Sequence, residues 1–138
     1  MEERINAREL PTVAALAYLG DAVHSLDIRR RAVAAGLAKS GRLHAFSAAI
    51  VNAAAQAAML TALEPMLTEE ERDLCRRAAN SKHLQHPKHA SDLDYRRATA
   101  LEALLGAHAY LGNEERLALL LEAAYNSLKG EQNHDTEN

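Results

Sequence analysis

A helical pattern that encloses one acid constrains this sequence most. Apolar side chains recur every three or four residues from Thr12 into the arginines at 29–31, which is the spacing of one helix face. Asp21 lies off this face, in the small-residue run Ala17-Tyr-Leu-Gly-Asp-Ala22. Because a carboxylate is seldom buried alone, we expect it either to bind a cation or to lie exposed on the helix flank. The predicted buried stripe consists of Val13, Leu16, Leu19, Val23 and Leu26.

A second acid occupies a similar setting later in the chain. Glu102 lies in Thr99-Ala-Leu-Glu-Ala-Leu-Leu-Gly-Ala107, inside a strongly helical pattern that we predict for residues 95–111. Gly20, directly before Asp21, costs about 1 kcal/mol in a helix interior relative to alanine, so we expect it to mark close packing or a bound ligand. If the two helices pack together, the two carboxylates would converge as oxygen ligands for Mg²⁺.

The composition favours an all-α fold. The chain has 138 residues, is 48% hydrophobic with many alanines and leucines, and contains 4% aromatic residues. We expect a flexible N-terminus at residues 1–9, one helical domain at 10–128 and a disordered tail at 129–138. The single Cys75 is compatible with a reducing compartment, and no signal sequence or long apolar window is present, so we expect a cytoplasmic location.

Positive charge is concentrated in one part of the chain. The net charge is −3, yet residues 71–97 contain seven Lys and Arg against four acids. This stretch includes residues 80–93, which have no helical period and contain Pro87, so we predict a long loop there. A local basic excess favours an anionic partner such as backbone phosphates, although each arginine has the alternative of a solvated helix face. The candidate contacts are Arg76, Arg77, Lys82, Lys88, Arg96 and Arg97.

The two acidic motifs resemble those of a known enzyme family. Ala17-Tyr-Leu-Gly-Asp-Ala22 is similar to the signature of the ribonuclease III catalytic domain, and Leu101-Glu-Ala-Leu-Leu-Gly-Ala107 is similar to its second acidic motif. Over about residues 10–128 the pattern resembles the short bacterial form, Mini-ribonuclease III. We expect no double-stranded-RNA-binding domain, because 138 residues leave no room for one.

The resemblance implies an all-α homodimeric endonuclease that uses Mg²⁺ to cleave double-stranded RNA. It further implies maturation of large-subunit (23S) ribosomal RNA as the task, with a ribosomal protein as a candidate partner. It assigns Asp21 and Glu102 as the catalytic and metal-binding acids, and the basic residues above are our candidates for the RNA contacts. Ala14 and Thr99 stand where ordinary members of the family have further acids, so the number of metal ions per site stays open.

Two other classes of protein stay open on the sequence alone. A helical RNA-binding or ribosome-assembly module that keeps the fold without the chemistry would explain Ala14 and Thr99. A helical protein-interaction domain would instead use Asp21 and Glu102 as buried partners of arginines. Mg²⁺-dependent RNA cleavage distinguishes the enzyme from both alternatives. Salt-sensitive RNA affinity distinguishes the RNA-binding module from the protein-interaction domain.

Overall fold

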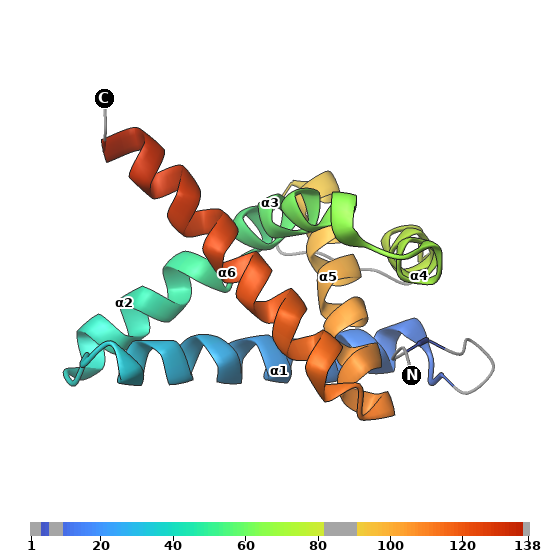
Figure 1. Ribbon diagram of the computed structural model, residues 1–138, viewed down its shortest axis with the longest axis horizontal. Coiled ribbons are helices and arrows are strands. Elements are labelled where there is room, and N and C mark those ends of the chain that lie inside the picture. The colour runs from blue at the N-terminus through green and yellow to red at the C-terminus, as the bar shows by residue number, and fades with distance from the viewer. Residues whose placement is uncertain (1–3, 6–9, 82–90, 137–138) are drawn as a thin grey trace.

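The structure, a computed structural model, describes residues 4–5, 10–81 and 91–136, with side chains described through residue 129. This part of the chain forms helices and contains no strand, which confirms the all-α prediction (Figure 1). In chain order the elements are α1 (Val13–Ala34), α2 (Ser40–Ile50), α3 (Ala53–Leu63), the 3-10 turn η2 (Glu64–Met66), α4 (Glu69–Ala79), α5 (Asp92–Leu111) and α6 (Glu114–Thr136).

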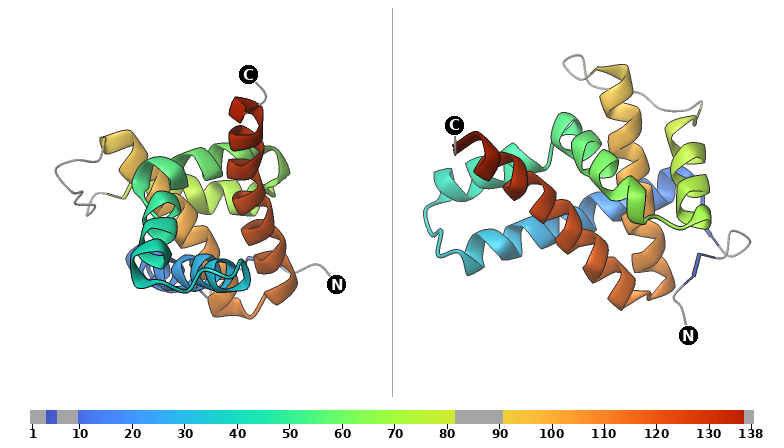
Figure 2. Two further views of the ribbon diagram at one scale, coloured as in Figure 1. Left: turned by 90° about the vertical axis from the view of Figure 1, so that its left-hand side faces the viewer. Right: turned by 45° about the horizontal axis from the view of Figure 1, so that its top comes forward.

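Helix α5 is the centre of the molecule. It packs against α1, α3, α4 and α6, and two further views show its C-terminal part among these helices while its N-terminal end projects from them (Figure 2). With the exception of Glu102, every residue from Ala98 to His108 is buried. The predicted stripe of this helix is confirmed, because Leu101, Leu104 and Leu105 are fully buried. The core around them is completed by Met59, Leu63, Leu74 and Leu120 from the neighbouring helices.

Most helix ends follow the local signals in the sequence. The side chains of Thr12 and Asn52 each accept a hydrogen bond from a main-chain N–H of the first turn of α1 and α3. Thr68 and Glu71 form a capping box at the start of α4. At the other end of α1, Gly36 adopts a left-handed φ of +88°, which ends the helix.

The two chain ends differ from the predicted organisation. Residue Ile5 was assigned to a flexible N-terminus, but its side chain is buried in the core, and the Arg4 main-chain oxygen accepts a hydrogen bond from Asn113. A disordered tail was expected from residue 129, whereas α6 continues to Thr136. No proline interrupts the chain there, and each residue added to an existing helix gains a hydrogen bond.

The loop predicted for residues 80–93 is shorter than expected at its far end. α5 begins at Asp92, because the Ser91 hydroxyl accepts a hydrogen bond from the main-chain N–H of Asp94 at 3.0 Å and caps the helix. The remainder of that loop, residues 82–90, lies outside the described residues, as do 1–3, 6–9 and 137–138.

The predicted stripe of helix α1 is confirmed in part, since Leu16 is buried and Val13 and Val23 pack against the core. Leu26 of the predicted stripe is 53% exposed, whereas His24, which lies off that stripe, is buried. The fully buried face combines large side chains with a glycine and an alanine, which let a neighbouring helix approach closely. Its buried residues, spaced four apart, are Leu16, Gly20, His24, Ile28 and Ala32.

The close approach occurs where α1 crosses α5. A Cβ atom added at Gly20 would lie 1.7 Å from the main-chain oxygen of Glu102. One added at Gly106 would lie 1.9 Å from the main-chain oxygen of Leu16. Both distances are far below any real carbon–oxygen contact, so the two helix backbones touch at this crossing. The expectation that Gly20 marks close packing is confirmed.

Helix α3 packs against α5 and α6, and α2 joins it to α1. α3 buries Gln56, Ala57, Met59, Leu60 and Leu63. Among the described residues, no single helix is long and apolar enough to cross a membrane. Only Ser40–Ile50 taken together with Ala53–Met66 reaches that length and composition, and this pair is bent by 52°.

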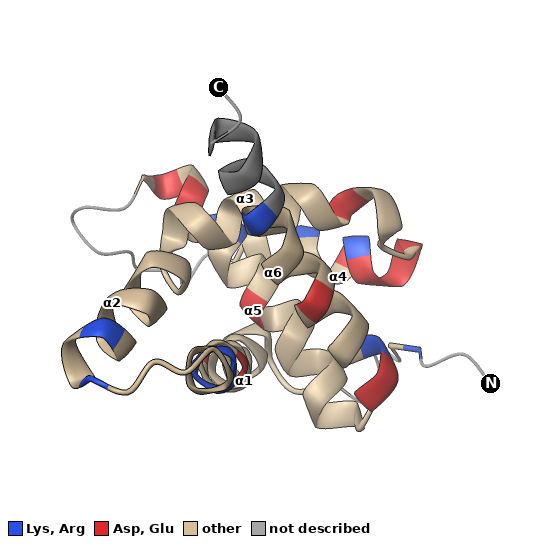
Figure 3. Ribbon diagram, turned by 60° about the vertical axis from the view of Figure 1, so that its left-hand side comes forward, with Lys and Arg blue, Asp and Glu red and all other residues tan. Residues whose placement is uncertain are grey.

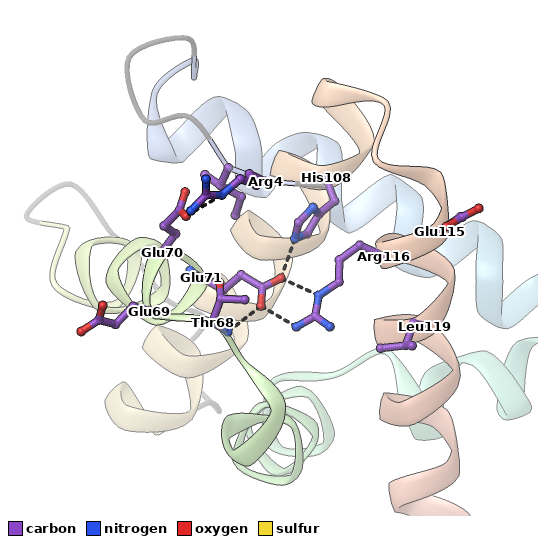
Figure 4. Close-up of a pocket in the computed structure, with 10 residues that line it drawn as sticks. Arg4, Thr68, Glu69, Glu70, Glu71, His108, Glu115, Arg116 and Leu119 are labelled. Atoms are coloured by element: carbon purple, nitrogen blue, oxygen red, sulfur yellow. Dashed lines mark hydrogen bonds and ion pairs between the residues drawn. The ribbon is translucent and has the colours of Figure 1, made fainter. Parts of the chain in front are cut away.

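A buried ionic network joins α4, α5 and α6 (Figure 4). The Glu71 carboxylate, 2% exposed, accepts hydrogen bonds from His108 Nε2 at 2.7 Å and from Arg116 Nη2 at 2.6 Å. Burial alone would raise the pKa of Glu71, but the hydrogen bonds from His108, Arg116 and the main-chain N–H of Thr68 outweigh it and leave the pKa lowered. Because its charge is fully partnered, we assign Glu71 a structural role.

Candidate active site

The crossing of α1 and α5 brings the two predicted acids together. Asp21 follows Gly20 directly, and Gly20 touches the backbone of Glu102. The two side chains interact, because Asp21 is one of the causes of a raised pKa of the Glu102 carboxyl. Asp21 is exposed and Glu102 is partly buried, so the pair lies at the surface with one acid set into the protein.

Negative charge on Glu102 is disfavoured next to Asp21. Burial, the hydrogen bond to Asp21 and the charge of Asp21 together raise the pKa of the Glu102 carboxyl to about 8. A hydrogen bond from Gln56 acts in the opposite direction and has a smaller effect. The protein-interaction alternative requires an arginine partner for each acid. Among the described residues, no arginine or lysine forms an ion pair with Asp21 or Glu102. Two adjacent carboxyl groups without a cationic partner suit a metal cation.

Sequence reasoning left Gln56 unassigned, and it adjoins the acid pair. It projects from α3, is 4% exposed and hydrogen-bonds to Glu102. Its Nε2 lies 3.0 Å from Nδ1 of His24, a residue of α1 that is 1% exposed. Burial lowers the pKa of His24, and the nearby carboxylates of Asp27 and Asp21 only partly oppose this. The available signal was that Gln56 is the one polar residue between Ala53 and Leu60.

The two positions that depart from the ordinary family pattern add no acid. The Thr99 hydroxyl donates to the main-chain oxygen of Tyr95 at 2.9 Å, so it is turned back onto α5. Ala14 is exposed on α1. Within the described ranges, no group of three or more His, Cys, Asp or Glu is placed to hold a metal ion. Two carboxylates nevertheless fit Mg²⁺, which is commonly bound by one or two protein carboxylates together with water and phosphate oxygens.

The predicted RNA contacts on α4 and α5 are held in internal ion pairs. Arg76 and Arg77 both pair with Asp73. Arg96 pairs with Asp92 at 2.8 Å and donates to a main-chain oxygen of α4. These contacts leave the RNA-binding prediction untested, but they give each of these arginines a structural partner.

The other three predicted RNA contacts are Arg97, Lys82 and Lys88. Arg97 of α5 binds the Thr61 hydroxyl at 2.8 Å and pairs with Glu64, so it joins α5 to the end of α3. Lys82 and Lys88 lie outside the described residues. RNA binding by any of the six residues therefore stays a prediction.

A second basic surface was missed by counting charges along the chain. Residues 28–63 contain no Asp or Glu at all. Arg31 is paired with Asp27 and Glu122, whereas the other four cations of this stretch are exposed and have no ion pair with the described residues. The lysines and arginines at the junction of α1 and α2 are visible in Figure 3. We call this surface the α1–α2 patch, formed by Arg29, Arg30, Lys39 and Arg42.

Comparison with known proteins identifies the class. The family described as the ribonuclease III domain matches residues 14–113, which include both acids and the crossing. A solved crystal structure of a Fusobacterium nucleatum protein has the same fold, with a TM-score of 0.77 and 31% identity, and the match covers 90% of this chain and 97% of that one. The chain therefore belongs to the ribonuclease III family and is an endoribonuclease, which excludes the non-catalytic alternative.

Within the family, the similarity is to its short bacterial members. Mini-ribonuclease 3 of Brevibacillus brevis is 40% identical over 130 residues, covering 94% of this chain and 97% of the relative. Mini-ribonuclease 3 of Symbiobacterium thermophilum is 41% identical over 119 residues, covering 86% of this chain and 91% of the relative. These matches confirm the resemblance drawn from the two acidic motifs.

Proposed function

We propose that the protein is a Mg²⁺-dependent endoribonuclease that cleaves double-stranded RNA. The observation that carries the proposal is the pair of Asp21 and Glu102 at the α1–α5 crossing, where Gly20, directly before Asp21, contacts the backbone of Glu102. The pair provides hard oxygen donors, and its negative charge is not compensated by a described cation. Family membership supports RNA as the substrate.

In this proposal the chain's own residues bind and orient. Asp21 and Glu102 would hold Mg²⁺, which when bound polarises a phosphate and lowers the pKa of water. The exposed Asp21 faces the side from which a phosphodiester approaches, while the partly buried Glu102 is fixed from behind by α3. Ala14 leaves the solvent side of α1 open for the RNA backbone.

We further propose that two copies act together. Tyr18, Leu26 and Val33 of α1 are 84%, 53% and 67% exposed. Their spacing of eight and seven residues places them within about 80° of one another around the helix. An exposed apolar stripe of this kind suits a protein partner, and a second copy would place a site on each side of it. Each copy would then cut one strand of a duplex.

The α1–α2 patch supports a site for the RNA backbone. Arg29 lies eight residues beyond Asp21 on the same helix, which is about 12 Å along the axis. A-form RNA is bound mainly through its phosphates and 2′-hydroxyls, and cations without an internal partner lose no ion pair on contacting phosphate. We therefore extend the predicted RNA surface from the paired arginines of α4 and α5 to this patch.

Charge removal at the two basic surfaces will distinguish them. Replacing all four patch residues by alanine should reduce the slope of log affinity for duplex RNA against log salt concentration by about 3. The matched variant replaces Arg76, Arg77, Arg96 and Arg97, and it removes the same charge but should change the slope less. Filter binding without Mg²⁺ measures both slopes. A larger effect from the second variant would favour the original set over the patch.

The cellular task is the most specific part of the proposal. The resemblance to the short bacterial members supports precursor 23S ribosomal RNA as the substrate and a ribosomal protein as a helper. A cytoplasmic location stays a prediction. These points are separate from the chemistry, because a purified duplex can report cleavage without them.

The function is tested by incubating the protein with a long RNA duplex. We expect cleavage with Mg²⁺ and none after chelation by EDTA, because two carboxylates alone supply no Lewis acid. Sequencing of the products should show staggered ends with 5′ phosphates and short 3′ overhangs. Single-stranded RNA of the same sequence is the control. An intact duplex with Mg²⁺, also when precursor ribosomal RNA and ribosomal proteins are supplied, would overturn the proposal.

A further inference from the structure

Gln56 is the part of the site that neither the motifs nor the family resemblance assigned. Resting on the proposed function, we propose that Gln56 is a positioning residue, which His24 orients so that its amide holds the Glu102 carboxylate toward Asp21. In this role Gln56 restrains the orientation of the Glu102 carboxylate oxygen that would bind the metal. Gln56 itself touches neither substrate nor metal in this proposal.

The argument begins with the elements involved. Asp21 and Glu102 are aligned by the contact between α1 and α5, but that contact fixes only main-chain atoms. The Glu102 side chain has three rotatable bonds beyond its Cα atom, so its carboxylate needs a separate restraint. Gln56 provides one from α3, an independent helix packed on α5.

The amide nitrogen of Gln56 has two hydrogens. One of them is directed at Nδ1 of His24, which lies 3.0 Å from the nitrogen. The second hydrogen remains for the Glu102 carboxyl, the other polar group with which this side chain interacts. The contact with His24 therefore presents the nitrogen end of the amide, and not its oxygen end, to the acid.

His24 determines this orientation. It is 1% exposed, and because burial lowers its pKa the ring is neutral near pH 7. A neutral ring that carries its proton on Nε2 leaves a lone pair on Nδ1, and that lone pair selects the nitrogen end of the Gln56 amide rather than the oxygen end. His24 lies three residues after Asp21, so α1 supplies both one acid and the restraint that acts on the other.

The first test detects the hydrogen bonds directly in metal-free protein. The Gln56 side-chain amide signals in a ¹⁵N spectrum are assigned by their loss in Gln56→Leu. In Glu102→Ala, we expect one of the two amide protons to exchange about tenfold faster, since its hydrogen-bond acceptor is lost. The proton that faces His24 should stay protected. In Glu102→Gln, which keeps an acceptor oxygen, both should stay protected.

The second test measures metal binding and catalysis. Loss of a hydrogen-bonding partner behind a metal ligand commonly costs about 10- to 100-fold in affinity or activity. We expect Gln56→Leu to weaken Mn²⁺ binding, followed by electron paramagnetic resonance, by that factor. It should lower kcat similarly while KM for duplex RNA changes little. His24→Phe, which keeps a ring but loses the acceptor, should show a smaller loss in the same direction.

A control separates positioning from simple loss of stability. Met59→Ala removes a fully buried side chain of α3 that has no polar link to the site. It should lower the melting temperature but leave kcat and Mn²⁺ affinity unchanged well below that temperature. The inference is overturned if the exchange rates of both Gln56 amide protons are unchanged in Glu102→Ala, or if Gln56→Leu keeps full Mn²⁺ affinity and kcat. Failure of the parent protein to cleave RNA would overturn the proposed function instead, since the spectra and Mn²⁺ binding need no substrate.

Discussion

Asp21→Asn and Glu102→Gln will each abolish RNA cleavage while the protein stays folded. Either change removes a carboxylate from a site that has only two, so the proposed Mg²⁺ loses a charged ligand. Because metal-assisted stabilisation of the transition state is worth several kcal/mol, the rate should fall by about 10³-fold or more. Initial rates on a labelled RNA duplex at saturating Mg²⁺ measure the loss.

The same substitutions should not destabilise the fold. The raised pKa of Glu102 means that its charged form is disfavoured in the folded protein, so a neutral glutamine should leave the melting temperature unchanged or raise it. Glu115→Gln, an exposed acid of α6, is the matched control for the charge change and should keep full activity. Cleavage at parental rates by either site variant would show that the acid pair is not the active site.

Gly20→Ala will strongly destabilise the fold. The new methyl group would lie 1.7 Å from the main-chain oxygen of Glu102, so α1 and α5 would have to move apart along the most closely packed line of the molecule. Main-chain atoms cannot rotate away as side chains do, and we expect a loss of about 3 kcal/mol or more. Urea denaturation followed by circular dichroism measures it.

Gly41→Ala is the matched control for this substitution. Gly41 lies in α2, and a Cβ atom there would meet nothing within 4 Å. Because alanine is the better helix former, this variant should be as stable as the parent or up to about 1 kcal/mol more stable. If Gly20→Ala unfolds at the same urea concentration as Gly41→Ala, the tight crossing described above is wrong.

Features that depend on neighbours in sequence were predictable. The caps at Thr12 and Asn52 and the capping box at Thr68 need only residues within one turn. The association of Asp21 with Glu102 was predictable as well, because each motif places an acid among small residues that allow close helix packing. Here local chemistry and the tertiary contact point to the same arrangement.

Features that depend on distant contacts were not predictable. The buried face of α1 follows the approach of α5 rather than the largest apolar side chains, so Leu26 is exposed and His24 is buried. The pairing of Arg97 with Glu64 joins residues 33 positions apart, and no count of charges reveals it. The role of Gln56 likewise needs α1, α3 and α5 to be placed together.

The glycine contact between α1 and α5 has a consequence for how this family tolerates sequence change. In most helix pairs the spacing depends on the side chains between them, so substitutions accumulated over evolution shift one helix against the other. Here no side chain lies between Gly20 and the backbone of Glu102. Substitutions elsewhere in the core can therefore shift other helices while the distance between the two acids stays the same.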